Sequence, residues 1–237
     1  MESPVTPAAP TIEIRDNSQR ATIAVQLFSV MCVYAVAVVI SDYLELRLLQ
    51  RVVAEDYVSD EDINMNNIRQ GLVTLLLIAF YITSAVLFLN WFRRAYGNLR
   101  RAGVTYLRFS DSMAVWSWFI PVVSFYRPVQ VMNEIWTETQ EQVRKYDDTH
   151  VMKDGDGLIG IWWALFIIQA LVSNFMLRVL FNFNTTPDLV LASRLTVVAD
   201  LLIIPGLILV IVLIRKVSAF ESKLAAEVVK AGGRVVQ

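Results

Sequence analysis

Long apolar runs alternate along this chain with shorter polar stretches. The helices that these runs predict cover about residues 21–49, 71–92, 158–180 and 195–214. A helix needs about 20 mostly apolar residues to cross a hydrocarbon core about 30 Å thick. The pattern therefore predicts an all-α integral membrane protein with four transmembrane helices.

A fifth apolar stretch, residues 113–125, decides the topology. It is shorter than a span and contains Pro121, and short segments of this kind are typical of re-entrant or interfacial elements. We predict that it does not cross the membrane. A fifth span is the alternative, and it would move the C-terminal residues to the opposite side.

Arginine and acidic residues are divided unevenly between the loops. Residues 92–109 hold five arginines and no acid, whereas residues 52–70 hold five acids and one arginine. Because loops rich in lysine and arginine stay in the cytoplasm, we expect the first stretch to be cytoplasmic and the second to lie outside. With four spans, both termini are then cytoplasmic. We expect the protein to lie in the inner membrane of a cell.

The insert between the second and third spans, residues 93–157, is predicted to carry an amphipathic helix over residues 128–146. Pro128 suits the first position of such a helix, and the remaining residues separate into an apolar and a mostly acidic side. An acidic side is unsuited to anionic lipid, so we expect the apolar side to pack against the protein's own spans or a partner. The apolar positions are Val129, Met132, Ile135, Trp136 and Val143.

The two ends of the chain differ in character. Residues 1–20 contain three prolines and little periodicity, which predicts a flexible cytoplasmic tail. Residues 215–237 continue the last span as an amphipathic cytoplasmic helix, and Gly232 and Gly233 are its expected stop.

Composition excludes several functional classes. The 237 residues carry a net charge of −1, which gives no overall electrostatic case for nucleic acid. A single cysteine, Cys32, and a single histidine, His150, leave no internal disulfide and no Cys/His metal cluster within one chain. Glycine-rich phosphate loops and nucleophile-elbow motifs are missing from the sequence. We therefore expect no catalytic residues, no cofactor and no metal, and a protein that is not an enzyme.

Among the polar residues inside the predicted third and fourth spans, three are candidates for a polar site: Asn174, Arg178 and Asp200. A charged side chain within a span costs at least ~2.5 kcal/mol on insertion scales, so it faces a partner or water. Because the two spans are antiparallel neighbours, Arg178 and Asp200 can meet at similar depth. A structural ion pair and a proton or ion pathway are both open interpretations. Pro205 and Gly206 add a possible break in the fourth helix.

Several motifs resemble a catalogued family. They are residues 91–100 (WFRRAYGNLR), residues 118–121 (WFIP) followed by 126–136 (YRPVQVMNEIW), and residues 162–163 (WW). Together they resemble the bacterial membrane family described as domain of unknown function 4328, over roughly residues 71–214. This chain has Ser124 and Tyr126 where an asparagine and a tryptophan are expected. The resemblance implies a bacterial multi-pass protein and supplies no mechanism.

Two functional hypotheses follow. The first is a non-enzymatic protein whose cytoplasmic face contacts membrane lipid head groups or a protein partner, with a homo-oligomer also open. The second is a small transporter or channel subunit with a polar path around Asp200, Asn174 and Arg178. For the first, the candidate contact residues are Arg93, Arg94, Tyr96, Asn98, Arg100, Pro121, Tyr126, Arg127 and Trp136.

Overall fold

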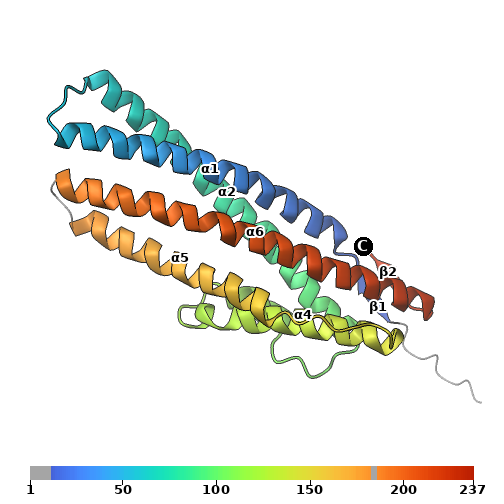
Figure 1. The fold of residues 1–237 in the computed structure, drawn as a ribbon. Helices are drawn as coiled ribbons and strands as arrows, with labels where there is room; N and C mark the ends of the chain where they lie inside the picture. The colour runs from blue at the N-terminus through green and yellow to red at the C-terminus, as the bar shows by residue number, and fades with distance from the viewer. Residues whose placement is uncertain (1–11, 183–185) are drawn as a thin grey trace, which may run out of the picture. The chain divides into compact units, whose positions relative to one another are not determined.

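The computed structural model describes residues 12–182 and 186–237, and it describes side chains for residues 12–175 and 188–237 (Figure 1). Of the described residues, 79% are helical. It divides into two compact units. The membrane unit comprises Ala24–Leu87 and Gly160–Leu213, and the terminal unit comprises Met1–Ile23, Phe88–Ile159 and Ile214–Gln237.

The membrane unit is formed by parts of four long helices: α1 (Ser18–Val53), α2 (Asp60–Arg101), α5 (Asp156–Asn182) and α6 (Thr186–Lys230). Each contains one of the predicted spans, and among the described residues these four helices are long and apolar enough to cross a membrane. Only 11–28% of the residues in their most apolar windows are buried. Most of this apolar surface therefore faces outward, as lipid contact requires. The prediction of an all-α membrane protein with four spans is confirmed.

Three of these helices are longer than a membrane is thick. With a rise of about 1.5 Å per residue, the 42 residues of α2 extend about 63 Å, roughly twice the hydrocarbon thickness. The apolar runs end near Phe92 in α2 and Ile214 in α6. The stretches of α2 and α6 beyond those residues belong to the terminal unit and lie outside the spans.

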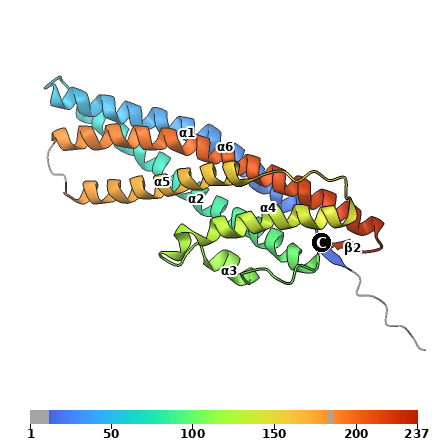
Figure 2. The same cartoon turned by 60° about the horizontal axis from the view of Figure 1, so that its bottom comes forward.

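The terminal unit has its own core. The end of α2, the end of α6 and α4 (Arg127–Tyr146) contribute its buried side chains, and Figure 2 shows α3 (Asp111–Trp116) beside α4. On α6 the buried residues recur at helical spacing, which is why this polar stretch packs one side inward. They are Ile214, Val217, Phe220, Leu224 and Val228.

Glycines end both long helices of the terminal unit. Gly103 has φ +93°, and Val104 N–H donates to the Leu99 carbonyl at 3.0 Å, as in a Schellman motif. Gly232 has φ +88°, and Gly233 N–H donates to Val228 at 2.9 Å. The stop that the sequence predicts at Gly232 is therefore confirmed.

Two short strands join the described ends of the chain (Figure 1). Strand β1 (Glu13–Arg15) pairs in parallel with β2 (Arg234–Val236), with Ile14 opposite Val235. This corrects the expectation of a flexible tail over residues 1–20 and of a helix over 215–237, within the described residues. Ile14 is buried against Val143, Leu224 and Val228, so a single apolar side chain anchors the strand.

The fifth apolar stretch is not a continuous helix. It begins in α3, which ends at Trp116, and continues through turns to the 3₁₀ turn η1 (Val123–Phe125). The six residues of α3 extend only about 9 Å, too short for a crossing. The five-span alternative is therefore wrong. Helix α4 then begins at Arg127, which places Pro128 one residue later than expected.

Candidate functional site

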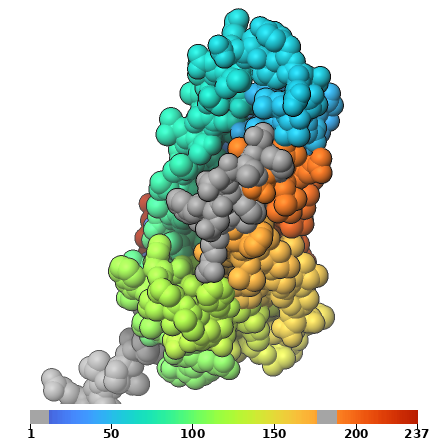
Figure 3. All heavy atoms as spheres, turned by 90° about the vertical axis from the view of Figure 1, so that its left-hand side faces the viewer, coloured from blue at the N-terminus to red at the C-terminus, as the bar shows by residue number. Residues whose placement is uncertain are grey.

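An exposed apolar loop, residues 116–126, follows α3 in the terminal unit. The light-green part of the chain, to which this loop belongs, lies on the surface seen in Figure 3. Apolar side chains exposed together in this way mark contact with lipid or protein. Those exposed here are Trp116, Phe119, Ile120, Val122, Phe125 and Tyr126.

Trp118 fastens the apolar loop to α2. Its ring meets those of Phe88 and Phe92 edge-on, with centroid distances of 5.4 and 5.9 Å. Phe88 and Phe92 also stack on one another at 5.5 Å. Because these two phenylalanines occupy the last turn of the second apolar run, Trp118 holds the loop at the level where that run ends.

The backbone at the tip of the loop is strained. Val122 has φ 67° and ψ −50°, and Val123 N–H donates to the Pro121 carbonyl at 2.8 Å. This is a γ-turn of the rare and strained form, with a β-branched residue at its centre. Glycine adopts this conformation readily, whereas valine adopts it only at a cost in backbone energy. The Val122 side chain is 70% exposed.

Beside the apolar loop, Arg127 and Tyr96 contact the neighbouring segments around Phe109 and Glu134. The Arg127 guanidinium lies 4.6 Å from the centroid of the Phe109 ring and 5.9 Å from that of Tyr126, which is cation–π geometry. The Tyr96 hydroxyl donates to Glu134 Oε2 at 2.6 Å and accepts from Phe109 N–H at 3.2 Å. Burial and the Glu134 hydrogen bond raise the pKa of Tyr96. Tyr96 is therefore neutral and structural.

The arginines after the second span have different surroundings. Arg93 is exposed, and Arg94 donates to the Asp16 carbonyl at 3.4 Å. Arg100 pairs with Asp111 at 3.1 Å and also donates to the Phe109 carbonyl. Arg93 is thus the most accessible of the three to an external group.

Asn98 belongs to a buried polar network with Asn17 and Glu221. Asn98 Nδ2 donates to the Arg15 carbonyl at 2.8 Å and to Glu221 Oε1 at 3.2 Å, and its Oδ1 accepts from Arg15 N–H at 3.2 Å. Asn17 Nδ2 donates to Glu221 Oε2 at 3.0 Å and to the Trp91 carbonyl at 3.2 Å. Asn17 and Glu221 were not predicted as site residues, since nothing in the sequence pattern distinguishes Glu221 from the exposed acids of an amphipathic helix.

Trp136 is a core residue. Its ring meets Phe220 edge-on at 5.1 Å, and its indole N–H donates to the Lys153 carbonyl at 2.7 Å. The same carbonyl accepts from Gln140, whose Oε1 in turn accepts from Lys153 N–H at 2.7 Å. Gly155 passes so close to the indole that an added Cβ would lie 2.6 Å from ring atoms. Trp136 therefore fixes the segment that leads into α5.

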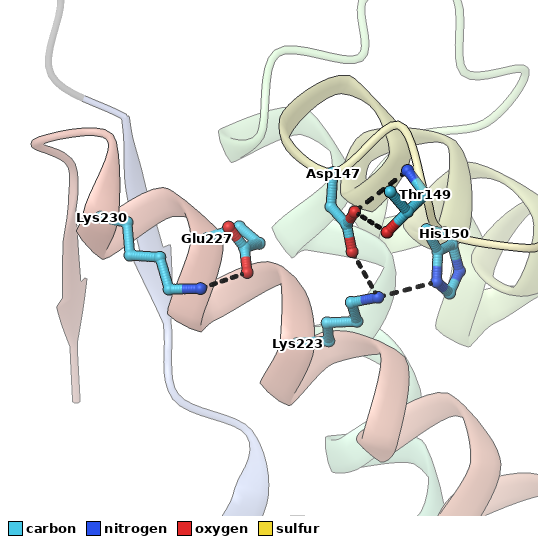
Figure 4. A network of polar contacts seen from close by, with 6 residues as sticks. All are labelled: Asp147, Thr149, His150, Lys223, Glu227 and Lys230. Atoms are coloured by element: carbon cyan, nitrogen blue, oxygen red, sulfur yellow. Dashed lines mark hydrogen bonds and ion pairs between the residues drawn. The ribbon is translucent and has the colours of Figure 1, made fainter.

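A polar network ties the end of α4 to α6 (Figure 4). Lys223 Nζ lies 2.8 Å from Asp147 Oδ2 and 3.1 Å from His150 Nδ1. Hydrogen bonds from Lys223 and Thr149 lower the pKa of Asp147 to about 2. Desolvation and the Lys223 charge lower the pKa of His150, which is consequently neutral at physiological pH. We interpret this network as structural.

The candidate polar residues of the spans are not brought together by the described contacts. Asn174 is exposed and donates to Ala170 of its own helix at 2.8 Å. The side chain of Arg178 lies outside the described residues. The carboxyl group of Asp200 lies near that of Asp42 of α1, and its Oδ2 is buried without a hydrogen-bond partner. The small pocket beside Asp200 is lined mainly by apolar side chains and by Tyr34 and Tyr81.

The contact residues that the sequence suggests therefore form two groups. Tyr96, Asn98 and Trp136 are buried and structural, whereas Pro121 and Tyr126 are exposed on the apolar loop. Arg127 supports the end of that loop. The loop combines exposed apolar side chains, a strained tip and an attachment to α2 at the end of the second apolar run.

Comparison with known families gives one match. The model of the family described as Domain of unknown function (DUF4328) matches residues 54–219, more than half of the chain. No curated protein and no solved structure matches.

Proposed function

The chain belongs to the family described as Domain of unknown function (DUF4328), and from that premise we propose that it acts by contact at a membrane surface, with the apolar loop inserted among lipid head groups. The observation that carries this proposal is the attachment of the loop, through Trp118, to Phe88 and Phe92. A loop at the level where an apolar span ends meets the head-group layer of that leaflet.

The chemistry of the apolar loop suits an interface better than water. Aromatic rings such as those of Trp116 and Tyr126 are favoured at head-group depth. Arg127 closes the loop and Arg93 is exposed just beyond the second apolar run, so cations are available to lipid phosphates. The positive-inside pattern supports the cytoplasmic leaflet as the site of insertion and a bacterial inner membrane as the location.

Transport is a less well supported function. The pocket at Asp200 has mainly apolar walls, and Asn174 bonds within its own helix. Contact through the apolar loop is therefore the function that we propose.

Spin labels at two exposed valines test the insertion. In a Cys32→Ser background, a nitroxide is placed at Val122→Cys in the loop or at Val151→Cys, which is 79% exposed in the segment after α4. In liposomes we expect the label at 122 to collide more with oxygen than with a water-soluble nickel complex, and the label at 151 to show the reverse. Equal nickel accessibility at the two positions would refute insertion.

Replacing Val122 by glycine tests whether the backbone at this position is strained. We expect Val122→Gly to raise the unfolding free energy in detergent by up to about 1 kcal/mol, because glycine relieves the positive φ. Val123→Gly is the matched control, since Val123 lacks a positive φ and loses only side-chain packing. Thermal unfolding of both variants measures the difference. A larger loss in Val122→Gly than in Val123→Gly contradicts the assignment of strain to Val122.

A further inference from the structure

Glu221 lies in a polar pocket inside the terminal unit, away from the apolar loop. The side chain is 9% exposed and lies seven residues beyond the apolar run of α6. The pocket has a cavity volume of about 30 Å³, which is enough for an occupant the size of a water molecule. Asp16, Asn17, Asn98, Ser218 and Ser222 supply most of its polar lining.

The hydrogen-bond donors of the two amides are all used. Asn17 Nδ2 serves Trp91 and Glu221, and Asn98 Nδ2 serves Arg15 and Glu221. An amide nitrogen has only two hydrogens, so neither has another to give. Asn17 Oδ1, in a residue only 4% exposed, is buried without a partner, and so is Ser218 Oγ. The unused buried groups are therefore one amide oxygen, which can only accept, and one hydroxyl oxygen, which can accept as well as donate.

The charges around Glu221 do not neutralise it directly. Asp16, at the pocket lining, has its pKa lowered by hydrogen bonds from Ser18 and is ionised at neutral pH. Arg15 lines the pocket as an exposed side chain and is bound to Asn98 through its backbone. Arg94 reaches the Asp16 carbonyl instead of the Glu221 carboxyl. A buried carboxylate held only by amides is costly unless a positive charge joins it.

We propose that this pocket binds a small monovalent cation, held by the Glu221 carboxylate with Ser218 Oγ and Asn17 Oδ1 as neutral oxygen donors. A monovalent ion suits the single buried carboxylate. A divalent ion is less suitable, because the described part of the chain contains no cluster of three or more acidic, histidine or cysteine residues able to hold a metal. The cation competes with a proton for Glu221, so binding strengthens as the pH rises.

Thermal unfolding in different chloride salts tests the site. The full chain in detergent at pH 8 is compared in NaCl, in KCl and in N-methyl-D-glucamine chloride at equal ionic strength. We expect sodium or potassium to raise the midpoint by roughly 3 to 6 °C at about ten times its dissociation constant. At pH 5.5 the increment should disappear, because the proton occupies Glu221.

Three variants make the result specific. Glu221→Gln should abolish the cation increment and Ser218→Ala should reduce it. Glu227→Gln should retain it, because Glu227 lies on the same helix and pairs with Lys230. The proposal is overturned if N-methyl-D-glucamine chloride gives the same midpoint as sodium and potassium. It is equally overturned if Glu221→Gln keeps the full increment, which would indicate a general salt effect.

Discussion

Replacing Glu221 by glutamine is expected to remove about 3 kcal/mol of pH dependence from the unfolding free energy between pH 4.5 and 8, in sodium- and potassium-free buffer. Burial raises the pKa of Glu221 from 4.5 to about 7. In the unfolded chain this group ionises above pH 4.5, whereas the folded protein holds the proton up to about pH 7. The wild type therefore loses stability as the pH rises from 4.5 to 7, and the glutamine variant should not.

Unfolding free energies of the two proteins, measured from pH 4.5 to 8.5 in N-methyl-D-glucamine salts, give the comparison. The difference in unfolding free energy, variant minus wild type, should be constant below about pH 4.5 and should rise progressively up to about pH 7. Parallel curves over this range would show that Glu221 ionises freely in the folded protein. Glutamine has nearly the shape of glutamate, so a change in packing does not explain a pH-dependent difference.

Replacing Trp136 by alanine is expected to destabilise the terminal unit by about 3–5 kcal/mol. The indole is 2% exposed, contacts Phe220 and donates a hydrogen bond to the Lys153 carbonyl. The variant loses this packing, leaves a cavity beside Gly155 and removes one of the two donors to the partly buried Lys153 carbonyl. Chemical unfolding in detergent measures the loss. Hydrogen exchange of residues 147–155 measures the effect on the segment that Trp136 contacts.

Trp116 provides the control for this substitution. It is also a tryptophan of the terminal unit but is 62% exposed, on the apolar loop. We expect Trp116→Ala to change the unfolding free energy in detergent by no more than about 0.5 kcal/mol. Similar losses in the two variants would contradict the division of the aromatic residues into structural and contact groups.

The main elements of the fold could be predicted from the sequence because lipid exposure leaves a strong signal. Apolar runs about 20 residues long have few alternative interpretations, and all four predicted spans lie within helices. Helix α4 and the stop at Gly232 were also predicted, since periodicity and glycine caps are local properties. The loop at residues 116–126 was recognised as apolar, but its γ-turn was not, because a valine with positive φ contradicts local preference.

The polar network was missed because it depends on distant contacts. Asn17 and Glu221 are separated by 204 positions, and Asn98 and Glu221 by 123. On its helix Glu221 follows the buried Phe220, and no local rule shows that the core closes over both residues. Strand β1 was missed for the same reason, since three residues pair only with residues near the other end of the chain.

The pairing of Ile14 with Val235 has a consequence for biosynthesis. A ribosome must translate more than 200 further codons after β1 before the partner strand β2 exists. A chain truncated before β2 still has the residues that bury Ile14, but it leaves Asp16 N–H without the Val236 carbonyl. The β1–β2 pair can therefore form only after every described helix has been synthesised, so the terminal unit is closed in one of the last steps of folding.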